Sequence, residues 1–261
     1  MHKVGKTIAF IWMIILLVSC NRETITTPSP PIANRPTPTS TRMPTPRVTT
    51  DTSVELSEFQ FPEFIDPTQE YLFYLHGKII EDQGIHAVSP QFGTYEYEAI
   101  LNEFQNHNFV VISERRPKNT DSDQYARKIA AQITQLLKAN VPPTRITVVG
   151  ASKGSYIAAE VSNLLKNSEL NFVLLGSCVP EVVTDWKQGQ MVFYGNILAI
   201  YDSADDLAGS CQEIFALSRG KGIARYNEII LHIGTGHGIL YKPLEDWVLP
   251  AIEWATLSVK P

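Results

Sequence analysis

The chain has 261 residues, of which 44% are hydrophobic and 19% charged, proportions typical of a globular protein with room for one sizeable domain and accessory segments. Its formal net charge is −5, but residues 1–50 hold six Lys and Arg against one Glu, so residues 51–261 carry 16 basic and 26 acidic side chains. Nucleic acids are bound by clustered basic side chains, so this acidic balance argues against nucleic acid as a partner.

The N-terminal segment has the pattern of an export signal. A basic start precedes the apolar run Ile8–Val18, which as a helix would span about 16 Å, well short of a hydrocarbon core of roughly 30 Å. The run ends in Leu17-Val18-Ser19-Cys20, which resembles the lipobox of bacterial lipoproteins. That resemblance implies a signal peptide at residues 1–19 and a lipid on Cys20 that anchors the protein to an envelope membrane outside the cytoplasm. The alternatives are an ordinary secretory signal or a short membrane anchor.

Residues 20–57 form the next segment, in which prolines alternate with threonines and few side chains are apolar. Such a composition predicts a disordered tether with polyproline II character. At roughly 3.1 Å per residue, the tether could hold a domain up to about 100 Å from the membrane. We expect the folded domain to occupy residues 58–261.

Short apolar runs alternate with amphipathic helical patterns along this domain. In chain order we expect a strand at Tyr71–Leu75, a loop to about Thr94, a helix at Tyr95–Asn106, a strand at Phe109–Ser113, a helix at Asp123–Ala139, a strand at Ile146–Val149, a helix at Ser155–Leu165, strands at Phe172–Leu175 and Ile197–Tyr201, a helix at Glu213–Ser218, a strand at Ile229–Ile233 and a helix at Pro243–Ala255. This order predicts an α/β fold with a mostly parallel central sheet of about six strands and helices on both faces.

The third expected strand runs directly into Gly150-Ala151-Ser152-Lys153-Gly154, and a helix follows. A G-x-S-x-G sequence between a buried strand and a helix is typical of a nucleophile elbow, in which a tight turn presents the serine in a strained conformation. Side chains at Gly150 and Gly154 would collide where the helix packs against the strand. Ser152 is therefore the candidate nucleophile.

A serine hydroxyl needs a base to take its proton, and the base needs an acid to orient it. His237 is our candidate base, because it lies among glycines just after the last expected strand; the rival, His232, falls inside that strand. The acid should follow the preceding strand, where three aspartates compete. We choose Asp205, with Asp206 and Asp202 as alternatives.

The negative charge that develops on an attacked carbonyl oxygen requires fixed donors. In an elbow arrangement these donors are backbone N–H groups, one from the residue after the nucleophile and one from a loop after an earlier strand. Lys153 supplies the first, and His76-Gly77-Lys78 lies in the position of the second. We assign the second donor to Lys78, with Gly77 as the alternative, and expect His76 to hold the loop in place.

These features together resemble the α/β-hydrolase family. The order Ser152, Asp205, His237, the elbow and the His-Gly loop extend the resemblance over about residues 68–256. It implies a central sheet, a Ser-His-Asp triad and hydrolysis most often of a carboxylic ester. We expect no cofactor, and no metal either, because no cluster of His, Cys and Asp has the spacing of metal ligands. There are two departures: the first two antiparallel strands common in the family are not evident, and only about 20 residues separate the Phe172 and Ile197 strands. We therefore expect a minimal lid or none.

Two further pairs of residues have open interpretations. Arg115 and Arg116 follow the Phe109 strand and could clamp a carboxylate or phosphate of a substrate. They could equally form a structural ion pair with Glu114 or lie in a solvated loop. Cys178 and Cys211 are an even pair in an exported chain, so a disulfide is favoured over two buried thiols.

The sequence thus predicts a membrane-anchored serine hydrolase that cleaves small-molecule carboxylic esters through an acyl-enzyme intermediate. Two alternatives remain open. One is a serine peptidase or amidase that uses the same triad; the other is a non-catalytic binding or scaffold lipoprotein on the same fold, since fold alone does not fix function.

Overall fold

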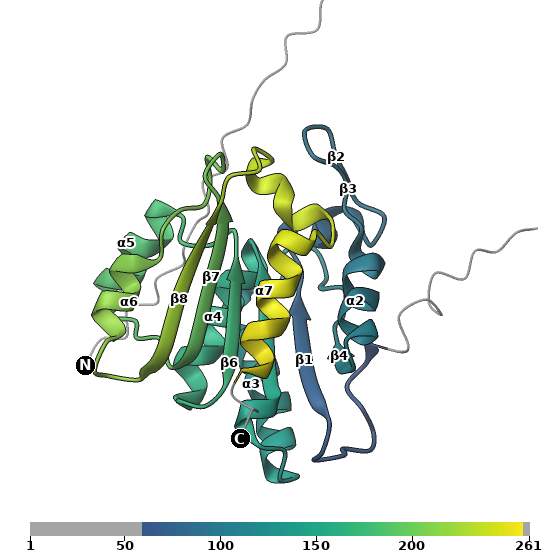
Figure 1. The fold of residues 1–261 in the computed structure, drawn as a ribbon, viewed down its shortest axis with the longest axis vertical. Coiled ribbons are helices and arrows are strands. Elements are labelled where there is room, and N and C mark those ends of the chain that lie inside the picture. The colour runs from purple at the N-terminus through teal and green to yellow at the C-terminus, as the bar shows by residue number, and fades with distance from the viewer. Residues whose placement is uncertain (1–58, 258–261) are drawn as a thin grey trace, which may run out of the picture. The chain divides into compact units, whose positions relative to one another are not determined.

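A computed structural model describes residues 59–257 of the chain (Figure 1). The predicted signal peptide, its lipidation site Cys20 and the predicted tether lie outside the described residues. Within them, a single large sheet lies between two layers of helices.

The large sheet has six strands, and every neighbouring pair is parallel. Their spatial order is β4 (Phe109–Ile112), β1 (Glu70–Leu75), β5 (Ile146–Ala151), β6 (Asn171–Leu175), β7 (Gly195–Asp202) and β8 (Ile223–Leu231). The prediction of a mostly parallel sheet of about six strands is confirmed. Because the strands are parallel, their carboxyl ends all meet at one edge, where a site can be assembled from several loops.

The helices divide between the two faces of the sheet (Figure 1). Strand β5 serves both faces, since Val148 packs into one buried apolar cluster and Val149 into the other. This two-sided burial explains why the inner strands are solidly apolar. The first cluster includes side chains of α3 (Ser122–Lys138), α4 (Lys153–Leu165), α5 (Pro180–Gln188) and α6 (Gln212–Ser218), and the second those of α2 (Tyr97–Asn106) and α7 (Glu245–Thr256).

The segment after β1 differs from the predicted loop. It contains the helix α1 (Lys78–Gln83) and a separate two-stranded hairpin, β2 (Val88–Ser89) with β3 (Gly93–Thr94). Neither element is long enough to show a hydrophobic period, so the pattern alone did not indicate them. Helix α5 was likewise not expected.

The last strand also begins earlier than predicted, at Ile223 instead of Ile229, and it ends at Leu231. β8 lies at the edge of the sheet, where half-buried and exposed side chains mix, so its first half lacks the apolar run of the inner strands. His232 consequently lies just after the strand, not inside it.

The connection between β6 and β7 is short, as predicted. Residues 176–194 hold only α5 and its flanking turns, and no long lid is inserted there. Among residues 59–257, no helix combines the length and apolar character needed to cross a membrane.

Candidate active site

Ser152 occupies a strained turn between β5 and α4. Its φ of 52° and ψ of −118° lie in a region that non-glycine residues rarely adopt. The turn is closed on both sides, since the Ser152 amide donates to the Leu175 carbonyl over 2.9 Å and the Ser155 amide donates to the Ser152 carbonyl over 2.8 Å. Ser152 therefore projects from the carboxyl edge of the sheet, as a nucleophile elbow requires.

The two glycines of the elbow are sterically required. A Cβ on Gly150 would overlap the Gly154 carbonyl, and a Cβ on Gly154 would overlap the Leu75 carbonyl at the end of β1. The start of α4 thus lies in backbone contact with both its own strand and the neighbouring one. This geometry matches the collisions expected from the sequence.

The structure brings Ser152, His237 and Asp205 together. The His237 Nε2 atom lies 3.0 Å from Ser152 Oγ, and the His237 Nδ1 atom lies 2.7 Å from Asp205 Oδ2. His237 is in a short 3₁₀ helix, η3 (Gly236–Tyr241), which follows β8, and Asp205 lies in the turn after β7. The Asp205 side chain is fully buried, and His237 is 8% exposed.

The environment of Asp205 favours its ionised form. Burial by itself raises the pKa of this carboxyl, but the hydrogen bond and the charge of His237, with the amides of Ala208 and Leu207, lower it below its ordinary value. Those amides donate to Oδ1 over 3.0 and 2.9 Å. A carboxylate only accepts, so it selects the His237 tautomer with the proton on Nδ1. The Nε2 lone pair then faces Ser152.

The two alternative acids lie elsewhere. Asp202 is buried, but its carboxylate accepts from the amides of Ala204 and Thr235 over 2.9 and 2.8 Å. It therefore fixes the start of the glycine-rich loop, residues 234–238. Asp206 is exposed. The rival base His232 is also exposed, and its Nδ1 lies 2.9 Å from Ser203 Oγ.

Gly77 and Lys78 lie beside the elbow, where the second oxyanion donor was expected. Lys78 is the first residue of α1 and Gly77 is its N-cap. A Cβ placed on Gly77 would be 3.6 Å from the Cβ of Ser152. Lys153 is the first residue of α4, and the initial N–H groups of a helix have no partner within it.

Tyr95 lies beside Gly77, since a Cβ on Gly77 would be 3.9 Å from its ring. Burial raises the pKa of Tyr95 to about 12, although hydrogen bonds with the Tyr74 hydroxyl and the Gly77 backbone lower it. The choice of Lys78 over Gly77 as the second donor stays a prediction.

His76 holds the loop in place, as its sequence position suggested. Its Nε2 accepts from the Arg116 amide over 2.9 Å, which leaves Nδ1 to donate to the Gly77 carbonyl over 2.8 Å. Burial, reinforced by the charge of Arg116, keeps the pKa of His76 well below its ordinary value. His76 is therefore neutral.

Arg116 does not have either of the roles predicted for it. None of its side chain is exposed, so it cannot clamp a substrate, and its ion-pair partner is Glu81, not Glu114. Glu114 instead pairs with Lys128 over 2.5 Å. Arg115 is exposed, and its role as a substrate ligand stays a prediction. The sequence did not single out Glu81, since no spacing links it to Arg116.

A scan against models of protein families gives no match, and a search of curated proteins gives none either. Among solved structures, SOBER1 from Arabidopsis thaliana is similar, with a TM-score of 0.50 and 13% identity over 74% of this chain and 100% of that one. A single-residue variant of SOBER1 has the same score over 73% of this chain. Esterase PE8 is similar at a TM-score of 0.48, with 14% identity over 70% of this chain and 90% of that one.

The chain has the α/β-hydrolase fold. The fold class predicted from the sequence is confirmed, including the short β6–β7 connection. At such low identity the likeness establishes the fold alone, and the activity has to be argued from the site.

One pocket of this α/β-hydrolase fold adjoins His237. It has a volume of about 190 Å³, and besides the glycine-rich loop it is lined by Gln91, Phe92, Ala204 and Asp206. Gln91 and Phe92 come from the turn of the β2–β3 hairpin, which was not predicted. Pro90 in that turn and Gly93 directly after it were the available signal for a hairpin.

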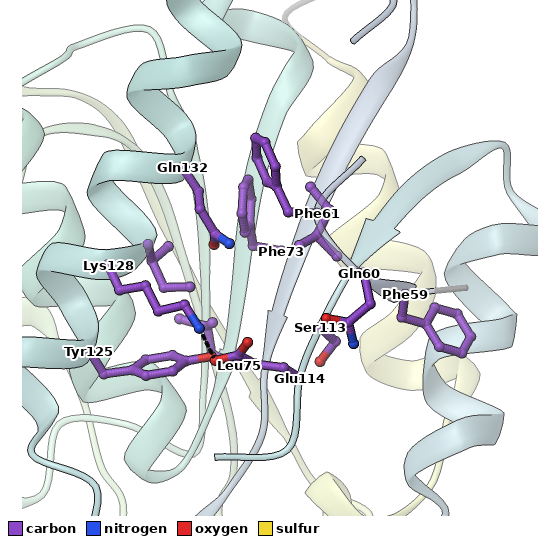
Figure 2. A pocket seen from close by; sticks show the side chains of 12 residues that line it. Phe59, Gln60, Phe61, Phe73, Leu75, Ser113, Glu114, Tyr125, Lys128 and Gln132 are labelled. Carbon is purple, nitrogen blue, oxygen red and sulfur yellow. Dashed lines mark hydrogen bonds and ion pairs between the residues drawn. The ribbon is translucent and has the colours of Figure 1, made fainter. Parts of the chain in front are cut away.

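A second pocket, of about 250 Å³, lies between residues 59–61, the ends of β1 and β4, and α3. Figure 2 shows the ion pair of Lys128 with Glu114 at its wall. None of the three residues that meet at the elbow lines it. Within residues 59–257, no group of three or more His, Cys, Asp or Glu side chains could hold a metal ion.

A disulfide joins Cys178, in the loop after β6, to Cys211, just before α6. Both sulfur-bearing residues are buried. The same loops are linked by the Gly209 amide, which donates to the Ser177 carbonyl over 3.0 Å. The loop after β6 also packs against His237, because a Cβ on Gly176 would be 3.1 Å from His237 Cε1.

Proposed function

We propose that this protein is a serine hydrolase that cleaves carboxylic esters through an acyl-enzyme intermediate. The observation that carries the proposal is the hydrogen-bonded chain from Ser152 through His237 to Asp205, with distances of 3.0 and 2.7 Å, on a strained elbow. A serine, a base and a buried acid in this relation form the arrangement that activates a hydroxyl nucleophile.

The reaction has two halves. Ser152 Oγ attacks the ester carbonyl carbon as His237 Nε2 takes the hydroxyl proton, and the amides of Lys153 and Lys78 donate to the resulting oxyanion. The intermediate collapses, the C–O bond to the alcohol breaks, and His237 gives its proton to the departing oxygen. Water then attacks the acyl-serine as His237 takes a proton from it. The bond between the acyl carbon and Ser152 Oγ breaks, His237 returns the proton to Oγ, and the carboxylic acid leaves. Asp205 stabilises the imidazolium throughout.

A small ester is the substrate class that this site suits best. The β6–β7 connection provides no long cover for a lipid chain, and the pocket beside His237 holds only about 190 Å³. The same triad could act on amides or peptides. A panel of short-chain nitrophenyl esters, amides and peptides separates these possibilities, and we expect the esters to be cleaved fastest.

The test of the triad combines a probe with substitutions. A fluorophosphonate should label the protein at Ser152, and Ser152→Ala should abolish labelling and lower ester hydrolysis by on the order of 10⁴-fold or more. Asp205→Asn should cost about 10⁴-fold, since it removes the acceptor that fixes the His237 tautomer. Ser168→Ala, an exposed serine, is the matched control.

Two results would count against this assignment. If the folded protein takes up no probe, a non-catalytic binding role on the same fold becomes the better explanation. If Asp206→Asn abolishes turnover while Asp205→Asn retains it, the acid has been misassigned.

We further propose that the protein is exported and held at an envelope membrane by a lipid on Cys20. The support is the sequence of residues 1–57, in which an apolar run ends at Cys20 and a proline-rich stretch follows. A substrate would then be met outside the cytoplasm.

A further inference from the structure

Glu81 is a fully buried carboxylate between two cationic side chains. Its Oε1 lies 2.7 Å from Arg116 Nε, and its Oε2 lies 2.7 Å from Lys153 Nζ. The Glu81 side chain has no exposed surface, and that of Lys153 is 18% exposed. A charge buried in this way is costly unless each oxygen is paired, and both are.

Each cation connects Glu81 to a different part of the site. Lys153 is the residue after the nucleophile, and its ammonium group also donates to the Thr120 carbonyl over 2.7 Å. The Arg116 guanidinium donates to the carbonyl of His76, the residue that begins the loop toward Lys78. Glu81 itself lies on α1, the helix that Lys78 opens. One carboxylate therefore links the elbow to the loop on the other side of the site.

We propose that Glu81 is a positioning residue that holds the two segments carrying the oxyanion donors, Lys153 and Lys78, in the correct relative position; this rests on the proposed function. The two segments already touch through their backbones, at Gly77 beside Ser152 and at Gly154 beside Leu75. Glu81 adds two ion pairs across that contact, one with Arg116 and one with Lys153. Without it, the positive charges of Arg116 and Lys153 would face each other with nothing between them.

The relative position of the two segments matters because donors act only when they point at the oxygen of the transition state. A donor displaced by about 1 Å can cost on the order of 100-fold in rate, even though the residue that moved it touches no substrate. Glu81 would act in this way, through the backbone amides of Lys153 and Lys78. A purely structural role, in which Glu81 only neutralises buried Arg116, predicts loss of folded protein and no change in the rate of what remains folded.

The deciding variant is Lys153→Met, which breaks the bonds of the ammonium group to Glu81 and to the Thr120 carbonyl but keeps the Lys153 amide and the buried Glu81–Arg116 pair. The measurement is the second-order rate constant for fluorophosphonate labelling across pH, with thermal unfolding recorded in parallel. We expect the rate to fall roughly 10- to 100-fold, every molecule to be labelled eventually, and the shape of the pH profile to stay unchanged. Lys153→Arg should recover most of the rate.

Two further variants complete the test. Glu81→Gln should slow labelling at least as much as Lys153→Met, and the double variant should be no slower than Glu81→Gln alone. Lys128→Met is the matched control, because it removes the Lys128–Glu114 ion pair from the loop that carries Arg116 without touching either donor segment (Figure 2). It should label at the wild-type rate.

The outcomes separate the two proposals. Wild-type rates in Lys153→Met, or a reduced labelled fraction with an unchanged rate, would overturn the positioning role and leave the hydrolase intact. A wild-type protein that takes up no probe would overturn the hydrolase and the role of Glu81 with it.

Discussion

Both ring nitrogens of His76 make hydrogen bonds inside the protein, and this makes the stability of the fold sensitive to acid. The native state holds His76 neutral, with its pKa well below the ordinary value because of burial and the Arg116 charge, whereas the unfolded chain protonates it near pH 6.5. Below that pH the unfolded state binds the extra proton. The contribution of His76 to stability is therefore complete above about pH 6.5 and declines as the pH falls, by up to about 1.4 kcal/mol per pH unit.

This prediction is checked by denaturant unfolding at pH 7.5, 6 and 5 for the wild type and His76→Gln. The stability advantage of the wild type should shrink as the pH is lowered. A pH-independent difference for His76→Gln would show that the histidine titrates alike in both states.

Single residues of the site were predictable to different degrees. Ser152 and His237 stand out in the sequence because each lies between glycines that a special backbone requires. Choosing Asp205 over its neighbours depends on which carboxylate the amides of the turn orient, and that is a property of three-dimensional geometry. Glu81 could not be found at all, since its partners are 35 and 72 positions away along the chain.

At the level of elements, the disulfide stabilises the loop that carries the acid. Asp205 accepts from two amides of its own turn, Gly209 in that turn donates to Ser177, and Cys211 closes the segment onto Cys178. Closing a loop across a sequence separation of 33 residues is worth roughly 3–4 kcal/mol on the chain-entropy model. We therefore expect the bond to contribute both to folding and to the position of Asp205.

We expect the double variant Cys178→Ala/Cys211→Ala to unfold at a lower temperature and to label with fluorophosphonate about tenfold or more slowly at a temperature where it is fully folded. A thiol reductant should reproduce both effects in the wild type. The same reductant should do nothing to the double variant, which controls for other effects of the reagent. Equal labelling rates would mean that the bond stabilises the fold without positioning Asp205.

Elements were predictable where they are long or buried. The four inner strands, the largely buried edge strand β4 and the long helix α3 show a clear apolar pattern, because burial on one or both faces imposes it. α1 and the β2–β3 hairpin are too short for any period, and the first half of β8 mixes exposed and half-buried side chains. α1 brings Glu81 to the site and the hairpin brings Gln91 and Phe92, so the absence of these two elements from the prediction left the surroundings of the triad undetermined.

At the scale of the whole molecule, the proposed anchor leads to a prediction independent of the catalytic chemistry. Expressed in a bacterium supplied with labelled palmitate, the wild-type chain should incorporate the label and sediment with membranes. Cys20→Ser should incorporate none, because the thiol that accepts the diacylglyceryl group is gone. Its labelling by fluorophosphonate should be unchanged, since Cys20 precedes the folded domain. Palmitate in Cys20→Ser, or its absence from the wild type, would contradict the anchor.

The contact between Gly154 and the end of β1 has a consequence for how the site comes into being. The nucleophile turn and the oxyanion segment meet through main-chain atoms of paired central strands, so neither can be ordered while the other is not. The conformational entropy of arranging them is lost once, during folding, and not again in each turnover. In the proposed reaction, a substrate would therefore meet donors and a nucleophile that folding has already put in place.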